Sequence, residues 1–443
     1  MAWIAELLPP RFTGAVKKWT LIKRIKEFHN LPLIGVRLRT LYLNHSFWAF
    51  ADQGLVSLGT FATNIILART LSPEDYGRYV IIFGVLLFLN SIQYAIITFP
   101  LTVRGAASDQ NSLRHLAISS LLFTTILALF LGVGMLGAAT ILGSIQLAPW
   151  AVSSLFFWQF QEVFRRALMA HQRYFEVMWG DALSYLGQAL LMLVLYWYGQ
   201  LSAQSTFAVI ALTSAIAGAV QAIQLGLTSI KFSQVWRVVD DFWRLGSWLL
   251  LHNLISNFFT FLSFPWALAY LYGVNEAAAL QAVLNIIGAS HPIIFCMRGL
   301  IVPATARSYR AAGKAAAQRI TFNYAIQGLI LLFPFYAIVL LWPRMLLTAF
   351  YGMDSPYLGL EAPLRLFVPA YTLFYMSVIL TSFIDGLEET RRALMAQLVS
   401  ACAFLIIGLP LTAWGGVIGA SLGRSVYGLT VVIACVVIIR KIK

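Results

Sequence analysis

The sequence predicts an all-α, polytopic membrane protein with about 12 transmembrane helices in two six-helix lobes around a central cavity. Of its 443 residues, 60% are apolar and 11% are charged, whereas soluble domains carry roughly 45–50% apolar and about 25% charged residues. Apolar runs of about 20 residues, the length that crosses a bilayer as a helix, recur along the chain. Since no polar stretch has the length of a soluble catalytic domain, we do not expect an enzyme with a separate globular head.

Twelve apolar runs bounded by polar clusters are the expected spans. They cover residues 47–69, 78–99, 115–138, 148–168, 177–199, 206–229, 246–271, 276–303, 320–342, 363–386, 392–413 and 415–439. The third and fourth runs nearly fuse through the weakly polar segment 137–149, so their boundary has the least support. On this map the chain has a cytoplasmic tail (1–46), a first lobe (47–230), a cytoplasmic linker (231–245) and a second lobe (246–443).

Lysine and arginine residues are distributed very unequally between the two sides of this map. Loops on the side of the two termini hold 26 of the 31. The other side holds only Arg69, Arg78, Arg344 and Arg365, and one residue, Arg424, lies within a span. Because cytoplasmic loops carry the Lys and Arg excess in membrane proteins, both termini are predicted to be cytoplasmic. The net charge of +14 is then an orientation signal, and no nucleic-acid partner is expected.

Two segments are amphipathic rather than apolar on all sides. Residues 11–30 carry apolar side chains at helical spacing and basic side chains mostly on the opposite face, as in helices that lie on anionic lipid surfaces. We expect this tail to bind anionic inner-leaflet lipids, and docking on a cytoplasmic protein partner is the alternative. Segment 231–245 is a shorter amphipathic linker at the middle of the chain.

A weak internal repeat accompanies the two predicted lobes. The first span ends in Leu67-Ala68 and the seventh in Leu268-Ala269, and a short acidic turn follows each pair. Repeats that are six spans apart have the same orientation in the membrane. The halves are therefore predicted to be parallel repeats related by an axis along the membrane normal.

Segment 66–79, with the sequence ILARTLSPEDYGRY, resembles the turn after the first span of bacterial polysaccharide flippases, a family of the multidrug/oligosaccharidyl-lipid/polysaccharide exporter superfamily. Segment 52–54 also looks like that family's first helix, whereas Val274 stands where the second half often has proline. The resemblance implies flipping of polyprenyl-pyrophosphate-linked oligosaccharide repeat units from the inner to the outer leaflet of the bacterial cytoplasmic (inner) membrane. Polysaccharide polymerase and export machinery are then candidate partners.

The residues of this turn have structural explanations of their own. Pro73 presets the backbone for a helix start, and Glu74 in the first helical turn complements the helix dipole. Gly77 would allow a neighbouring helix to approach closely. We therefore expect Arg69, Pro73, Glu74 and Gly77 to be structural, and the turn indicates a family rather than a substrate.

Arg424 is the deepest charge in the predicted spans, about nine residues or ~14 Å from the nearer end of its span. A charge at this depth costs at least ~2.5–3.5 kcal/mol and needs a partner or a wet cavity. Two interpretations stay open. Arg424 is either a buried arginine paired with a carboxylate or carbonyls, or a cavity cation whose planar fork binds a pyrophosphate or an acidic sugar.

Arg298 and Arg104 are further cavity candidates. Arg298 lies ~8 Å inside the cytoplasmic end of the eighth span, where it either snorkels to the interface or lines the inner mouth of the cavity. Arg104 has a matching place in the first half, after Pro100, and is either a cavity residue or a positive-inside charge. The resemblance implies cavity arginines in the region of Arg298.

Asp52, Asp181, His252 and His291 are candidates for coupling or for ion pairs. The two carboxylates lie at shallow depth, where they either pair with Arg104, Arg165 or Arg166, or titrate with a coupling proton or cation. The histidines can change charge near neutral pH. His291 precedes Pro292, which frees a backbone carbonyl, so a helix-kink role is the alternative.

No cofactor or metal site is predicted, because the three cysteines lie in apolar runs without ligand spacing and no Walker A loop is present. Two other functions compete with the flippase. One is a cation-coupled multidrug exporter of the same superfamily, which an aromatic, carboxylate-bearing cavity would favour. The other is a non-transport membrane scaffold of an envelope assembly. Arg298 and Arg424 favour the pyrophosphate substrate.

The topology is directly testable. Reporter fusions at Ser202 and Tyr357 should read extracytoplasmic, and fusions in the 231–245 linker and at Lys443 should read cytoplasmic. An opposite signal at either of the first two positions would show that the span count is wrong.

Overall fold

The computed structural model describes residues 45–226 and 232–442. The tail segment 11–30 lies outside the described residues, so its interaction with lipid stays a prediction. The described residues are helical almost throughout, and they include no β-strand. Phe50 and the residues before it group with an N-terminal unit, and the bundle described below comprises residues 51–443.

The first lobe is built from the helices up to residue 225. They are α3 (His45–Thr70), α4 (Pro73–Gln93), the π-turn η2 (Tyr94–Thr98), α5 (Phe99–Ala106), α6 (Gln110–Ile141), α7 (Ala148–Ala170), α8 (Tyr174–Asp181), the π-turn η4 (Ala182–Leu186), α9 (Gly187–Trp197) and α10 (Ala203–Leu225). The predicted break between the third and fourth spans is present, because α6 ends at Ile141 and α7 begins at Ala148 after a 3-10 turn, η3 (Ile145–Leu147).

The second lobe repeats this organisation. Its elements are α11 (Phe232–Asn257), the π-turn η5 (Phe258–Leu262), α12 (Ser263–Tyr272), α13 (Val274–Ile287), the 3-10 turn η6 (Gly288–Ser290), α14 (His291–Leu341), α15 (Pro343–Tyr351), α16 (Glu361–Gly386), α17 (Thr390–Ala403), the π-turn η7 (Phe404–Gly408) and α18 (Leu409–Lys441). The predicted linker is continuous with the seventh span, because residues 232–257 form one helix.

Seven helical stretches in the described residues are long and apolar enough to cross a membrane. Two of them, Val274–Leu341 and Thr390–Lys441, have 68 and 52 residues, whereas one crossing needs about 20. Each is bent back on itself at a non-helical residue, Gly313 (φ +74°) and Gly416 (φ +55°) respectively. Each stretch therefore holds two crossings. Together with α3, α7 and the α11–α12 segment, the described residues contain the twelve crossings that the sequence predicts.

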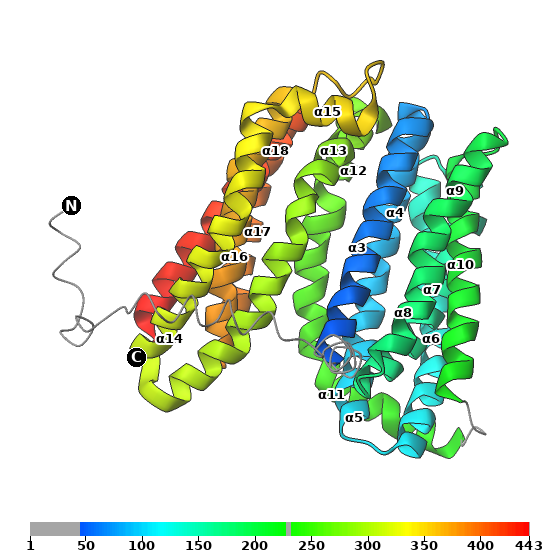
Figure 1. Ribbon diagram of the computed structural model, residues 1–443, viewed down its shortest axis with the longest axis vertical. Coiled ribbons are helices and arrows are strands. Elements are labelled where there is room, and N and C mark those ends of the chain that lie inside the picture. The colour runs from blue at the N-terminus through cyan, green and yellow to red at the C-terminus, as the bar shows by residue number, and fades with distance from the viewer. Residues whose placement is uncertain (1–44, 227–231, 443) are drawn as a thin grey trace, which may run out of the picture. The chain divides into compact units, whose positions relative to one another are not determined.

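Each lobe is organised around one central helix. In the first lobe α7 packs against α10 and α6, and in the second α18 packs against α16, α17 and α12. Figure 1 shows α14, α16, α17 and α18 gathered on the left and α4 and α6 to α10 on the right. The lobes meet along α4, which contacts both α13 and α11. In this contact Tyr76 Oη accepts a hydrogen bond of 2.9 Å from Asn285 Nδ2.

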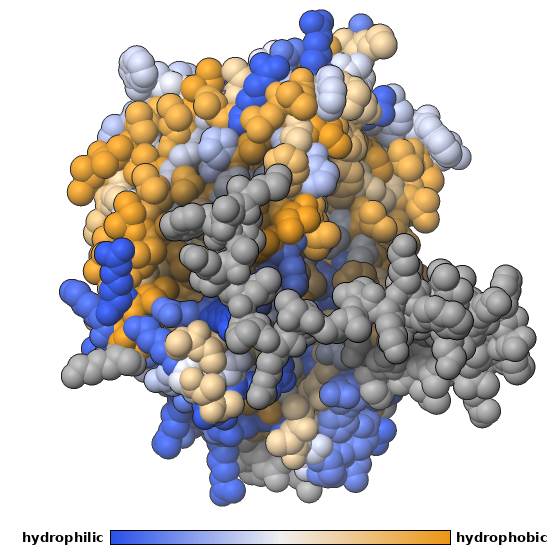
Figure 2. Space-filling view, turned by 60° about the vertical axis from the view of Figure 1, so that its left-hand side comes forward, coloured by the Kyte–Doolittle hydropathy of each residue, from blue (hydrophilic) through white to orange (hydrophobic). Residues whose placement is uncertain are grey.

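Basic residues gather at one end of the bundle. Figure 2 shows a band of apolar residues across the face in view, with hydrophilic residues at its upper edge and in larger number toward its lower end. Arg310, Arg319 and Arg440 are exposed, and the bend of α14, the start of α11 and the C-terminal end of α18 all lie in the lower part of Figure 1. These three segments, which are predicted to share one side, therefore lie at one end, and which end faces the cytoplasm stays a prediction.

The turn at 71–77 starts α4 with a complete cap. Ser72 Oγ accepts a hydrogen bond of 3.1 Å from Asp75 N, Pro73 is the first helical residue, and Arg78 pairs with Glu74 at 2.5 Å. Gly77 faces α13 so closely that a β-carbon at this position would collide with the backbone carbonyl of Val274. The glycine therefore sets how closely the two lobes approach in this region.

Replacing Gly77 with alanine should push α4 away from α13 and destabilise the fold by about 1–3 kcal/mol, as overpacking does. Gly134→Ala on α6 is the matched control, since nothing lies within 4 Å of a β-carbon placed there. Thermal unfolding of the detergent-solubilised variants measures the difference. Equal unfolding midpoints for the two variants would contradict the close packing.

Candidate functional site

Arg165, on α7, is the centre of a buried ion cluster in the first lobe. Its Nε donates to Asp181 Oδ2 at 2.6 Å, its Nη2 to Asp52 Oδ2 at 3.3 Å, and its Nη1 to Glu162 Oε1 at 3.2 Å. The side chains of Arg165, Asp52 and Asp181 are 7%, 1% and 0% exposed. Three crossings, α3, α7 and α8, therefore supply one charge network that is closed to solvent.

This cluster does not balance its own charge. Glu162 Oε2 also accepts from Arg166 Nε at 3.0 Å, so three carboxylates face two guanidinium groups. With all five groups ionised, the cluster carries one excess negative charge in a low-dielectric interior. A proton or a monovalent cation would neutralise this charge, which is the chemistry that a coupling site requires.

Polar groups extend the cluster along the interior of the first lobe. Asp181 Oδ1 accepts from Gln221 Nε2 at 3.3 Å, and one helical turn further on Ser184 Oγ donates to Gln161 Oε1 at 3.1 Å. Asp52 Oδ1 is buried and has no hydrogen-bond partner among the described residues. The glutamines were not singled out from the sequence, because a lone Gln in an apolar run carries no distinguishing pattern.

Arg104, at the end of α5, lies apart from this cluster. Its Nε and Nη2 bind the carboxylate of Asp241 at 2.7 and 2.5 Å, and both side chains are roughly half exposed. Asp241 is on α11, where Gly246 packs against the backbone of Ala95 and Ile96 in η2. The bidentate pair thus fixes α11 against the first lobe, and the sequence did not identify Asp241 as the partner.

Arg424, on α18, is surrounded by aromatic rings. Its guanidinium carbon lies 5.8 Å from the ring centres of Tyr371 and Phe374 and 6.0 Å from that of Phe264. Its Nε is buried without a hydrogen-bond partner, and no ion pair joins Arg424 to a carboxylate in the described part of the chain. The sequence left open that Arg424 is a buried arginine paired with a carboxylate or with backbone carbonyls. Among the described residues, neither kind of partner is found.

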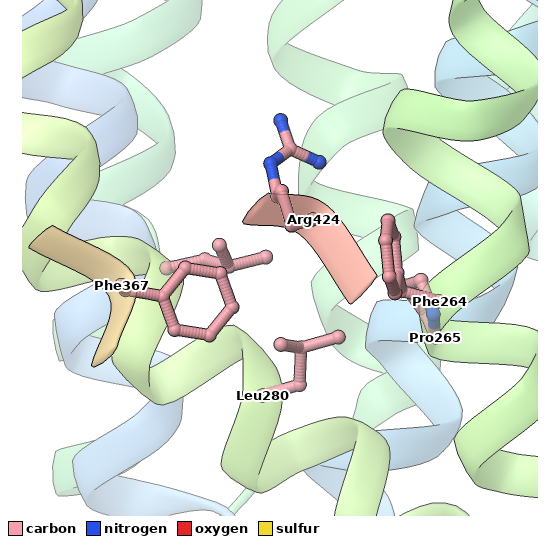
Figure 3. Close-up of a pocket in the computed structure, with 6 residues that line it drawn as sticks. Phe264, Pro265, Leu280, Phe367 and Arg424 are labelled. Carbon is pink, nitrogen blue, oxygen red and sulfur yellow. The ribbon is translucent and has the colours of Figure 1, made fainter. Parts of the chain in front are cut away.

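Arg424 also lines a small pocket in the second lobe. The pocket is shallow and partly open, it lies between α12, α13, α16 and α18, and its other lining residues are Phe264, Pro265, Leu280, Leu284 and Phe367. Figure 3 shows the guanidinium group pointing away from Leu280 and Phe367, so that the charged end leaves the apolar floor of the pocket. This arrangement combines apolar walls with one cation at the rim.

The remaining candidates lie elsewhere in the second lobe. Arg298 is exposed on α14, and its charge acts on Asp385 of α16 and on His252 of α11. Asp385 Oδ1 is buried and has no hydrogen-bond partner among the described residues. His291 is at the start of α14, stacked on Tyr371. The structure thus brings His291 together with Arg424 through a shared ring.

Because of the ion cluster, we expect alanine substitutions at the adjacent Arg165 and Arg166 to differ strongly in their effect on stability. Arg165→Ala leaves three carboxylates around an empty space and should cost about 3–5 kcal/mol, with a matching fall in membrane abundance. Arg166→Ala is the control, because Arg166 is 29% exposed and has a single acidic partner. Thermal stability and quantitative blots measure both. A normal level of Arg165→Ala would show that the cluster is not a structural unit.

The fold of this chain is similar to that of solved membrane transporters. No family model matches the chain, and no curated protein matches it significantly. Among solved structures, an inward-facing multidrug resistance MATE family transporter of the MOP superfamily has a TM-score of 0.72 at 16% identity, covering 87% of this chain and 94% of that chain. An outward-facing multidrug resistance MATE family transporter has a TM-score of 0.63 at 16% identity, covering 89% of this chain and 93% of that chain.

The lipid II flippase MurJ, in an inward closed conformation, has a TM-score of 0.72 at 11% identity, covering 90% of this chain and 87% of that chain. Identities this low show a shared fold. The chain is therefore a multi-pass membrane protein with the two-lobe fold of MOP superfamily transporters.

Proposed function

We propose that this protein is a transporter that flips polyprenyl-pyrophosphate-linked oligosaccharide repeat units from the inner to the outer leaflet of a bacterial cytoplasmic membrane. Alternating access between the two lobes would carry the headgroup across. The observation that carries the proposal is Arg424, a membrane-depth cation whose described neighbours are aromatic rings rather than carboxylates. The shared fold with MurJ and the resemblance of segment 66–79 to polysaccharide flippases support it.

The energetics of Arg424 favour an anionic ligand. Insertion of an arginine at this depth costs about 2.5–3.5 kcal/mol or more, and each cation–π contact returns about 0.5–2 kcal/mol. The rings therefore hold the guanidinium in place without using its in-plane N–H donors. Those donors match a phosphate oxygen pair in the bidentate geometry that lysine cannot reproduce.

The two other arginines have different parts in this proposal. Arg298, exposed on the same lobe, attracts the anionic headgroup toward the second lobe at the cytoplasmic side. Arg104 meets the substrate only once its pair with Asp241 opens, since its Nε and Nη2 are otherwise engaged. The Arg104–Asp241 pair is then a contact that forms and breaks during the transport cycle.

The excess negative charge of the first lobe provides the coupling site. Asp52 and Asp181 share Arg165, and one of the carboxylates around it must be neutralised by a proton or a cation to remain buried. Exchange of that proton or cation between the two sides of the membrane would drive the lobes through their cycle. His252 stays a further coupling candidate, close to the charge of Arg298.

A cation-coupled multidrug exporter is the second candidate function. The buried carboxylate cluster and the aromatic pocket both favour it, and MATE transporters share the fold. It requires a cationic drug to enter a pocket that Arg424 lines, where like charges repel. The arginine is therefore the residue that separates the two functions.

The test replaces Arg424 and measures both substrates. Arg424→Ala should reduce surface glycan by ten- to a hundred-fold, because a lost charged hydrogen bond is worth about 1.5–3 kcal/mol, while membrane abundance stays near normal. Arg298→Ala should also reduce export. Arg424→Lys keeps the charge without the fork and should retain partial export. Arg365→Ala is the matched control, since Arg365 is exposed and bonds the carbonyl of Leu340.

Export of a cationic dye by the same variants tests the second function. Normal glycan export combined with increased dye export in Arg424→Ala would replace the flippase by the drug exporter. Loss of the protein itself would return Arg424 to a structural role.

A further inference from the structure

His291 and Arg424 share two aromatic neighbours. The imidazole stacks on Tyr371 with ring centres 5.5 Å apart and planes inclined by 29°, and it meets Phe374 edge-on at 6.1 Å. The guanidinium carbon of Arg424 lies 5.8 Å from each of these same rings. The two basic groups, from α14 and α18, are therefore held by one pair of rings on α16.

The ring nitrogens of His291 are unused in the described residues, where no hydrogen bond to either of them is found. The titratable and charged groups around it are Arg424 on α18, Tyr371 on α16, and Tyr336 beside Ser290 from the second half of α14. No carboxylate acts on it among these neighbours. A half-buried imidazole with free polar atoms beside an arginine is suited to a ligand with negative charge.

The protonation of His291 depends on whether an anionic ligand is bound beside it. With the pocket empty, a proton on His291 would place a second positive charge beside Arg424 in an aromatic setting, so the imidazole stays neutral near pH 7. A phosphate or diphosphate that carries two or more negative charges is only partly balanced by one guanidinium. It stabilises the imidazolium, which then donates an N–H to a phosphate oxygen. A carboxylate carries one charge and is balanced by Arg424 alone.

We propose that His291 is a second recognition group beside Arg424 and selects phosphate and diphosphate esters over carboxylates. This rests on the proposed function and names the substrate chemistry of the same pocket. Binding of the diphosphate takes up a proton from solution. Affinity for it therefore rises as the pH falls from about 8 to 6, because binding favours the imidazolium, whereas affinity for a carboxylate of the same chain length does not.

The test uses the full-length protein in lipid nanodiscs, with farnesyl diphosphate and farnesoic acid as probes. Calorimetric titrations in buffers of different ionisation enthalpy count the protons taken up on binding. The wild type should take up a fraction of a proton approaching one with the diphosphate and none with the carboxylate. His291→Gln should bind the diphosphate about ten-fold more weakly near pH 6, with little change near pH 8, the ratio expected when a charged hydrogen bond is lost.

His115→Gln, on α6 of the first lobe, is the histidine control and should match the wild type. Because the diphosphate also titrates, the protein's share is the difference in proton uptake between wild type and His291→Gln. Wild-type binding that needs Arg424 but shows no such difference overturns the role of His291 and leaves the proposed function intact. No binding of either probe to the wild type overturns both. His291→Asn repeats the measurement, so a folding defect of one variant does not decide it.

Discussion

Balancing charge in a low-dielectric interior is the constraint on which the rest of this structure depends. The first lobe balances Arg165 with carboxylates from three crossings at 2.6–3.3 Å. The second lobe surrounds Arg424 with the faces of Phe264, Tyr371 and Phe374 instead. Carboxylates satisfy the donors of a guanidinium, whereas aromatic rings stabilise its charge and leave its in-plane donors free. On the proposed function, Arg165 is consequently part of the scaffold, and Arg424 is the arginine that binds the ligand.

Breaks in regular helix geometry, as π-turns and 3-10 turns, occur at corresponding places in the two lobes. They show the internal repeat more clearly than the sequence does. The second crossing has the π-turn η2 just before Pro100, and the eighth has the 3-10 turn η6 just before Pro292. The fifth and eleventh crossings contain the π-turns η4 and η7. Each pair is six crossings apart, as parallel repeats require. Such turns mark places where a helix departs from regular hydrogen bonding, often at functional sites. The correspondence is not complete, since the π-turn η5 of the seventh crossing has no counterpart in α3.

The spans and the break between α6 and α7 were predictable because hydropathy and helix termination are local properties. The partners of the charges were not, since Asp52 and Arg165 are 113 residues apart and Arg104 and Asp241 are 137 apart. From the sequence, Arg165 was one of three possible partners of Asp52, together with Arg104 and Arg166. Likewise, the position of Arg424 in its span was evident, but its rings come from α12 and α16, and only the fold brings them to it.

The asymmetry between the lobes has a mechanistic consequence. An excess negative charge sits in the first lobe when its five groups are ionised, and an unpaired positive charge sits in the second. On the proposed function, a coupling cation and a phosphate-bearing substrate then need not compete for one site. Coupling must then pass through the contact between the lobes. That contact runs along α4, which packs on α13 near Gly77, and along η2 and α5, which pack on α11 at Gly246 and at the Arg104–Asp241 pair. A change in the charge of the Arg165 cluster can alter transport only if it shifts how these surfaces pack, and close glycine contacts admit few intermediate arrangements. The two lobes are thus suited to switch between discrete positions rather than to slide continuously.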